Sequence, residues 1–272
     1  LPYYITSFFH LLGFSFITSM KILIGLSFIF SGIFMYIFSK DLFKNELAAF
    51  SVSVLYLFNP YHLIITHFKI PIGEILAYSI IPLVFYFINK YLDKKELVFI
   101  LLAGLMFGTV ALSHIVIAVF LAPLILLYIF LIVKKIDKTI LYYFSIIFIG
   151  ALVSAYQWSA SIIYKSYLFI TAYPQDPLAL LYSPTLSELL YAPWRLGFLF
   201  QGPKGETAYL LGYAQVLVLG IVIFLSIKEK IDKKEAYLLG RADKKTAKYI
   251  RSLEKKAIKA STRVGHPVSA AV

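Results

Sequence analysis

The chain has 272 residues, of which 60% are hydrophobic and 17% aromatic, and its mean hydropathy is +0.82. Several apolar runs of about 17 residues or more lack the polar stripe that a soluble helix carries at a 3.6-residue period, so the sequence excludes a soluble bundle and indicates a polytopic membrane protein. The absence of cysteine excludes disulfides and thiolate metal sites, and the net charge of +12 lies in short loops and one tail, which argues against a nucleic-acid partner.

In chain order, residues 1–19 are aromatic and amphipathic, and we expect them to be interfacial or re-entrant. About seven spans are predicted after them. They cover residues 22–39, 46–58, 72–89, 97–112, 115–133, 140–156 and 209–227. The second span is short for a hydrocarbon core of about 30 Å. Asn59-Pro60 ends it, because proline disfavours a helix in the residue before it.

The predicted fold class is therefore all-α: a polytopic transmembrane helical bundle over residues 1–227, followed by a basic tail over residues 228–272. Residues 157–208 are more polar, and we expect them to form an extracytoplasmic loop segment. Placing the tail in the cytoplasm puts most Lys and Arg of the short loops on the same side, as the positive-inside rule requires. We therefore predict a multi-pass protein of the plasma membrane with a cytoplasmic tail.

The most polar stretch inside the apolar part is NPYHLIITHFKIPIGE, residues 59–74, which holds His62, His67, Lys69 and Glu74. Ionisable residues at membrane depth are candidates for a functional site. Glu74 lies in the first turn of its helix, where it either caps free N–H groups or orients a substrate hydroxyl. For each histidine alone, a half-wet position at the interface is the simpler explanation. Their spacing matches no metal motif, so no cofactor is predicted and a divalent metal has no support.

Three further residues are candidates on the outer side. His114 follows Ser113 at a tight turn between two spans, where it is placed to face a shared cavity. Trp194 and Arg195 lie in the outer segment, where aromatic belts explain most Trp and Tyr, but a guanidinium also binds phosphate bidentately and an indole stacks on a sugar ring. The tail, above all residues 244–259, is either an amphipathic basic helix on anionic lipid or a plain topology anchor.

Several short motifs resemble the multi-pass family labelled 6-pyruvoyl-tetrahydropterin synthase-related membrane proteins. They are LPYY at 1–4, SGIFMY at 31–36, LFNPYH at 57–62, GE at 73–74, LSH at 112–114, YSP at 182–184 and YAPW at 191–194. The resemblance covers residues 1–227. Nothing in this sequence resembles the soluble pterin enzyme of the same name, which needs a zinc–histidine site on a compact α+β fold.

By architecture, this family looks like the GT-C superfamily of membrane glycosyltransferases. The resemblance implies a polyprenyl-phosphate sugar donor, an outward-facing cavity, and an acidic residue in the first outer loop as the base. That loop would precede Leu1, so we expect the catalytic acid upstream of this sequence and assign no catalytic residue within it. The candidates for substrate binding are Glu74, His62, His67, Lys69, His114, Trp194 and Arg195.

Two functions follow as hypotheses. The first is a GT-C-like glycosyltransferase, or a fragment of one, that transfers a sugar from a polyprenyl-phosphate carrier to an extracytoplasmic acceptor. The second is non-enzymatic: a membrane protein for lipid-carrier binding, transport or scaffolding that uses the same cavity. The expected partners are membrane lipids and a polyprenyl-phosphate-linked sugar.

Overall fold

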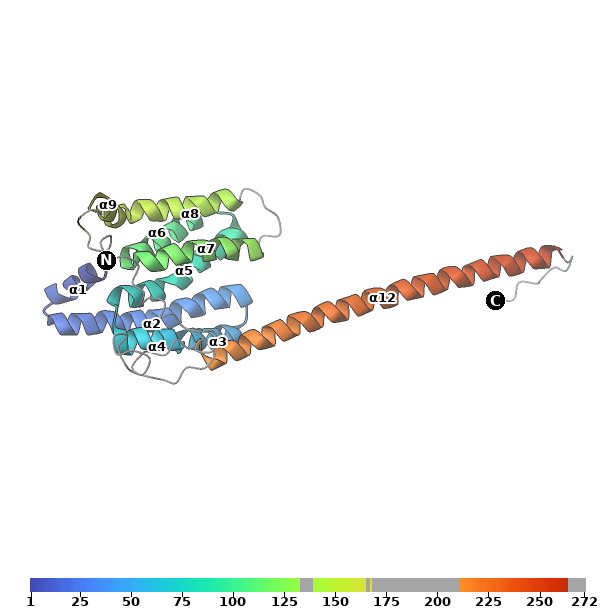
Figure 1. Ribbon diagram of the computed structural model, residues 1–272, viewed down its shortest axis with the longest axis horizontal. Coiled ribbons are helices and arrows are strands. Elements are labelled where there is room, and N and C mark those ends of the chain that lie inside the picture. The colour runs from blue at the N-terminus through green and yellow to red at the C-terminus, as the bar shows by residue number, and fades with distance from the viewer. Residues whose placement is uncertain (133–138, 165–166, 168–210, 264–272) are drawn as a thin grey trace. The chain divides into compact units, whose positions relative to one another are not determined.

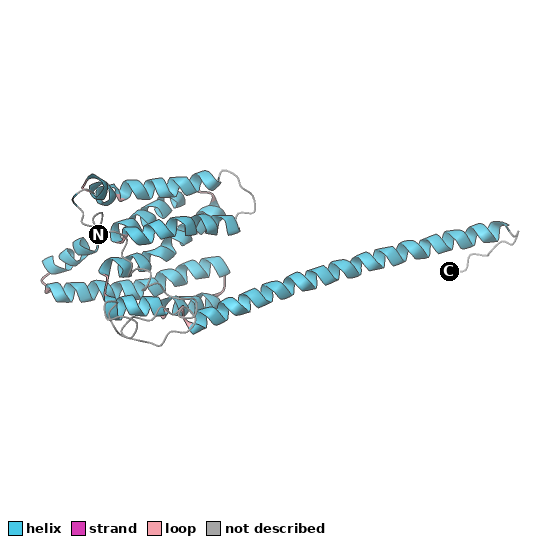
Figure 2. Ribbon diagram, viewed as in Figure 1, coloured by secondary structure: helices cyan, strands magenta, loops and turns pink. Residues whose placement is uncertain are grey.

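A computed structural model of the chain describes residues 1–132, 139–164, 167 and 211–263. All regular structure in these residues is helical (Figures 1 and 2), which confirms the all-α prediction. The chain divides into two compact units, Leu1–Gln215 and Val216–Val272. The first unit holds the helix bundle with the predicted site, and the second holds most of the long helix α12.

The helices follow one another with short connections. Their bounds are α1 Pro2–Leu11, α2 Phe16–Phe43, α3 Glu46–Leu57, α4 Pro60–Ile64, the π-helix η1 Ile65–Lys69, α5 Ile72–Lys94, α6 Val98–Ser113, α7 Ile115–Ile132, α8 Thr139–Val153, α9 Ala155–Ile163 and α12 Tyr213–Arg263. Short polar residues begin three of them by accepting a backbone N–H: Ser15 before α2, Asn45 before α3 and Asn59 before α4. The tight connections after α2, α5 and α6 make the helices on either side run antiparallel (Figure 1), whereas α4 continues from α3 with a bend.

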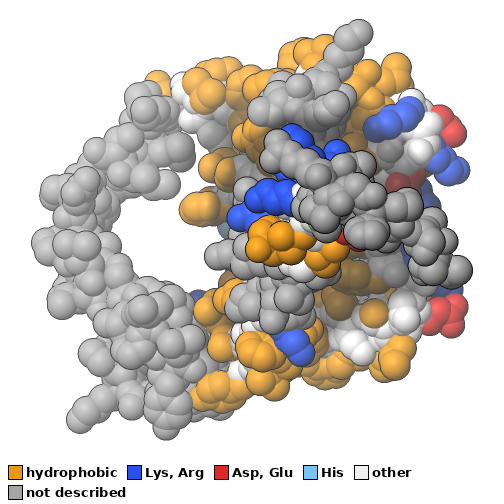
Figure 3. Space-filling model, turned by 90° about the vertical axis from the view of Figure 1, so that its right-hand side faces the viewer, with side chains coloured by type: hydrophobic (Ala, Val, Ile, Leu, Met, Phe, Trp, Pro, Cys, Tyr) orange, Lys and Arg blue, Asp and Glu red, His pale blue; other side chains and the backbone are white. Residues whose placement is uncertain are grey.

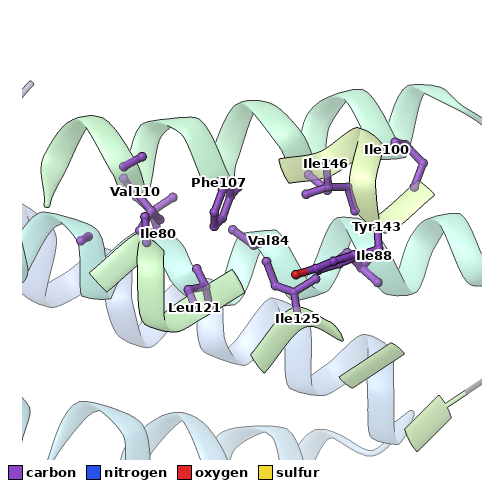
Figure 4. Close-up of a cluster of buried hydrophobic side chains, with 14 of the residues drawn as sticks. Ile80, Val84, Ile88, Ile100, Phe107, Val110, Leu121, Ile125, Tyr143 and Ile146 are labelled. Carbon is purple, nitrogen blue, oxygen red and sulfur yellow. The ribbon is translucent and has the colours of Figure 1, made fainter. Parts of the chain in front are cut away.

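The core of the bundle lies between α5, α6, α7 and α8. Figure 4 shows its apolar side chains meeting from these four helices, with Val84 of α5, Val110 of α6 and Ile125 of α7 fully buried. The other labelled members are Ile80, Ile88, Ile100, Phe107, Leu121, Tyr143 and Ile146. Close packing of this kind holds these apolar helices together.

Glycines bring α6 and α8 into close contact. A side chain added at Gly104 would place its Cβ 2.7 Å from Ile149, and one added at Gly108 would place it 2.6 Å from Val153. Gly104 and Gly108 are one turn apart, the small-xxx-small spacing that lets membrane helices approach closely. On α8, a Cβ at Gly150 would collide with the ring of Phe107.

Membrane-spanning potential is distributed unevenly over the helices. Phe16–Phe43 and Ile72–Lys94 are long and apolar enough to cross a bilayer, and the count rises to four if two bent pairs are each one span. These pairs are Glu46–Leu57 with Pro60–Lys69, bent by 45°, and Leu141–Val153 with Ala155–Ile163, bent by 70°. The described residues thus support a helical membrane protein with two to four candidate spans, and the seven predicted spans stay a prediction.

The remaining apolar helices are too short for that test: Val98–Ser113, Ile115–Leu131 and Tyr213–Lys228. Large apolar side chains nevertheless remain exposed along the bundle, among them Phe120, Phe144 and Phe148. In Figure 3 hydrophobic side chains cover much of the described surface of the face shown. Such a surface suits lipid rather than water.

A charged cluster joins the C-terminal ends of α2 and α5. Asp41 accepts hydrogen bonds from Lys44 at 2.9 Å, from Asn89 Nδ2 at 2.7 Å and from Lys90 Nζ at 2.5 Å. The opposite end of the bundle is where α5 begins and α6 ends, since the first turn of α5 lies against Ser113. That opposite end carries the candidate site.

Candidate functional site

Three helix ends supply the side chains of the site. Tyr61 lies in the first turn of α4, Glu74 lies in the first turn of α5, and His114 is the extended residue that separates α6 from α7. Asn59 caps α4 and Pro71 precedes α5, so local sequence fixes where both helices begin. The site therefore consists of residues at helix ends, where side chains are not committed to the core.

Glu74 is the centre of this group. Its Oε2 accepts a hydrogen bond from the Tyr61 hydroxyl at 2.9 Å, and its Oε1 lies 3.5 Å from Nε2 of His114. Both contacts reach side chains of other elements rather than the free N–H groups of its own helix. The geometry favours the interpretation of Glu74 as an orienting carboxylate over the capping alternative.

Gly73 allows this arrangement. A Cβ at Gly73 would collide with the backbone carbonyl oxygen of Ser113. The start of α5 can therefore lie directly against the end of α6, which brings Glu74 next to His114 although they are forty residues apart. In the pair GE at 73–74, the glycine thus permits the close approach of α5 to α6, and the carboxylate makes a contact across it.

A cavity of about 630 Å³ adjoins the cluster. Its lining includes Tyr3 and Tyr4 of α1, His114, and Tyr156 and Gln157 of α9. His114 belongs to both features, since its ring lies in the cavity wall and also contacts Glu74. Its Nδ1 is buried and has no hydrogen-bond partner among the described residues.

The α6 carbonyls at the cavity are held by neighbours. The backbone nitrogen of Leu1 donates to the Leu112 oxygen at 3.1 Å. With its amide nitrogen turned toward α6, Gln157 also donates to Leu112 O at 3.1 Å and to Ala111 O at 3.3 Å. Polar side chains and tyrosine rings around one cavity form the mixed lining that suits a ligand with hydroxyl groups and apolar faces.

His62 is not part of this cavity. Its ring is fully buried and lies between Phe28, at a centroid distance of 5.0 Å, and Tyr78, at 4.3 Å. Nδ1 donates to the Leu57 carbonyl oxygen at 2.9 Å, so Nε2 is the unprotonated nitrogen, and it has no partner in the described part of the chain. The half-wet interfacial position expected for His62 is wrong, because aromatic rings from α2 and α5 enclose it.

The other predicted residues separate into two groups. His67 and Lys69 are exposed on η1, and no contact among the described residues joins them to Glu74 or His114. Trp194 and Arg195 lie outside the described residues. As to metals, the described residues contain no group of three or more His, Asp or Glu side chains that could hold an ion.

Tyr61 is the site residue that sequence reasoning missed, together with the cavity tyrosines of α1 and α9. It stands thirteen residues before Glu74, a separation that no helical period links. The one available signal was its place directly after Asn59-Pro60. A capped proline start holds the first turn of a helix firmly and so gives Tyr61 a defined direction.

Comparison with known proteins gives one match. A family model described as "6-pyruvoyl-tetrahydropterin synthase related domain; membrane protein" matches residues 1–170. No curated protein and no solved structure matches the chain. The matched residues include Tyr61, Glu74, His114 and the cavity lining, and they end before α12.

Proposed function

The chain belongs to the 6-pyruvoyl-tetrahydropterin synthase related domain family of membrane proteins, and we propose that it binds a polyprenyl-phosphate-linked sugar and transfers the sugar to an extracytoplasmic acceptor, as a GT-C-like glycosyltransferase does. In this proposal the chain is a multi-pass protein of the plasma membrane with its basic tail in the cytoplasm. The cavity beside His114 then opens on the outer side.

The observation that carries the proposal is the position of His114 between a carboxylate and a cavity. Glu74 contacts the Nε2 side of the ring, and the same ring lines the space of about 630 Å³. The Glu74 contact fixes the orientation of the ring, so the exposed part of the His114 side chain forms a defined part of the cavity wall. Tyr3, Tyr4 and Tyr156 add aromatic faces on which a sugar ring can pack.

The phosphate of the carrier needs a separate partner. Among the described residues that line the cavity there is no Lys or Arg. Arg195, with Trp194 beside it, is the predicted contact for the phosphate, because a guanidinium forms two parallel hydrogen bonds to phosphate oxygens. His67 and Lys69, which are exposed on η1, stay further predicted contacts for the substrate.

The transfer step balances without a cofactor. The acceptor oxygen forms a bond to the anomeric carbon, the bond from that carbon to the phosphate oxygen breaks, and the electron pair leaves with the polyprenyl phosphate. The hydroxyl proton must pass to a base. In this proposal Glu74 and His114 orient the hydroxyl groups of the substrates, and the base itself is not assigned.

A non-enzymatic lipid-carrier-binding role is the second candidate. It is favoured by the contacts of Glu74, since both carboxylate oxygens already lie against side chains of the protein. A carboxylate held in this way serves binding as well as it serves chemistry. Both candidate functions require the same ligand, so only a measurement of sugar transfer distinguishes them.

The test uses the full chain in lipid nanodiscs with a radiolabelled polyprenyl-phosphate hexose. We expect saturable binding and, with a peptide or glycan acceptor, release of polyprenyl phosphate. Glu74→Gln should lower affinity about tenfold, because it removes a charge-assisted hydrogen-bond acceptor next to His114. Glu96→Gln, an exposed glutamate at the other end of the bundle, is the matched control.

The outcomes distinguish the two functions proposed for the site. Binding with acceptor-dependent release supports the glycosyltransferase. Binding without release for every acceptor class supports the carrier-binding protein. Absence of binding, or equal loss in Glu74→Gln and Glu96→Gln, overturns both proposals.

A further inference from the structure

Helix α12 changes character along its length. It runs without a break from Tyr213 to Arg263, and its first part, Tyr213–Lys228, is apolar. Large side chains in that part are exposed, among them Leu217, Phe224 and Ile227. An apolar helix with exposed side chains belongs in lipid, so this part ties the rest of α12 to a bilayer.

The later part of α12 is strongly basic. Residues 244–259 carry seven positively charged side chains and one negatively charged side chain, Glu254. The basic residues are Lys244, Lys245, Lys248, Arg251, Lys255, Lys256 and Lys259. This density of like charge opposes pairing with a second copy of the same helix.

The charges lie on one side of the helix. With about 100° of rotation per residue, the seven basic residues fall within a sector of about 140°, and Tyr249, Ile250 and Leu253 fall within a separate sector of about 100°. The three apolar side chains are 64%, 50% and 46% exposed, respectively. The segment is therefore a basic amphipathic helix whose apolar side is open.

We propose that residues 244–259 adsorb on a bilayer surface rich in anionic lipids, with Tyr249, Ile250 and Leu253 inserted at the interface. An anionic lipid surface satisfies both sides of the helix at once, since it offers negative head groups to the lysines and an apolar boundary to the three exposed side chains. Nucleic acid would match only the charge. The apolar start of α12 keeps the segment near the membrane, which raises its effective concentration there.

Adsorption has a geometric consequence for α12. Along a straight helix Lys228 and Tyr249 are about 32 Å apart. The field of a charged bilayer decays over about 8 Å at physiological salt. A straight α12 standing along the membrane normal would hold the basic segment beyond this field, so adsorption requires a bend between Lys228 and Lys244. Gly240 lies in that interval, and glycine is among the weakest helix formers.

The absence of cysteine makes the test direct. A single Thr246→Cys variant of the full chain places an environment-sensitive dye in the apolar sector, and Lys255→Cys places it in the basic sector. In nanodiscs that contain phosphatidylglycerol we expect a blue shift at residue 246, a smaller one at 255, and reversal of both at high salt. In pure phosphatidylcholine we expect neither shift.

Charge removal should abolish the response. Replacing Lys244, Lys245 and Lys248 by Gln should lower the adsorbed-to-free ratio on the order of 100-fold, since each basic residue contributes about tenfold or less near an anionic surface. The matched control replaces Lys21, Lys94 and Lys95, which are exposed lysines of the first unit. That control should retain the blue shift.

The bend is measured separately. Nitroxides on a Ser226→Cys/Ser252→Cys double variant should be about 39 Å apart along a straight helix and closer together in anionic nanodiscs. Equal spectra in the two lipids, a blue shift that survives the three glutamines, or an unchanged distance in anionic nanodiscs would each overturn the proposal. So would a shift that requires added RNA or an acidic protein.

Discussion

Two carboxylates at opposite ends of the bundle, those of Asp41 and Glu74, have different surroundings. At one end Asp41 is 8% exposed and accepts hydrogen bonds from Lys44, which caps α2, and from Asn89 and Lys90 of α5. At the other end Glu74 is 25% exposed and contacts Tyr61 and His114, which come from two other connections. Asp41 joins two helices to each other, and Glu74 joins three helix ends beside a cavity.

Both groups are carboxylates, so it is their partners and surroundings that indicate a structural role for Asp41 and a functional role for Glu74. Asp41 already accepts three hydrogen bonds from the ends of two helices, so its role is to hold these helices in register. The Glu74 end leaves His114 Nδ1 without a described partner and places the ring in a cavity wall. Because Nδ1 itself is buried, a ligand in the cavity would meet the exposed part of the His114 side chain and the polar and aromatic residues around it.

The largest effect expected is at Asp41. Asp41→Ala leaves Lys90, which is only 22% exposed, without its counter-charge and should destabilise the protein by about 3 kcal/mol. Thermal unfolding in detergent measures this loss. Asp93→Ala is the control, because Asp93 is 52% exposed and lies 3.8 Å from Lys44, so its loss should cost at most about 0.5 kcal/mol. Equal effects would mean that the Asp41 end is not a structural cluster.

A somewhat smaller effect is expected at the glycine contact between α6, which ends directly before His114, and α8. Gly108→Ala places a Cβ against Val153 and against the backbone of Gly150 and should cost about 2 kcal/mol in unfolding experiments. Gly25→Ala is the control, since nothing lies within 4 Å of that position, and it should stabilise α2 slightly. If ligand binding at the cavity survives Gly108→Ala unchanged, the site does not depend on this packing.

The candidate site itself should respond more weakly in stability than in binding. Tyr61→Phe removes one hydrogen bond to Glu74 and should cost about 1 kcal/mol, together with a fivefold to tenfold loss of affinity for the labelled polyprenyl-phosphate hexose. Tyr86→Phe, at the opposite end, keeps the ring that Lys90 covers and should change neither quantity. Loss of stability without loss of affinity would mean that Tyr61 has a structural role and does not contribute to ligand binding.

The helical class could be predicted from the sequence, because a long apolar run in lipid satisfies its backbone hydrogen bonds by forming a helix. It also placed the helix break at Ser113–His114, where α6 ends and α7 begins. Span counts were harder to predict, since hydropathy does not show that the 46–58 run continues through Asn59 into α4 and η1 with a 45° bend.

Contacts between distant residues were beyond sequence reasoning. The motif GE at 73–74 and the motif LSH at 112–114 were both recognised, but only the structure shows Gly73 against the Ser113 carbonyl and Glu74 beside His114. His62 shows the opposite limit. A histidine between apolar residues carries no local sign of whether water or aromatic rings will surround it, and here Phe28 and Tyr78 do.

The smallest effect expected is therefore at His62. His62→Phe keeps the stack with Phe28 and Tyr78, removes the unpartnered Nε2 and gives up one hydrogen bond to Leu57, so the net cost in unfolding should be no more than about 1 kcal/mol. Affinity for the labelled hexose should stay within about twofold of the parent, because the ring does not reach the cavity. His114→Phe, the same substitution in the cavity wall, should abolish binding by removing the Glu74 contact that orients the ring and the polar character of this part of the wall. A loss of binding in His62→Phe as large as that in His114→Phe would extend the site into the aromatic stack and erase the distinction between the two histidines.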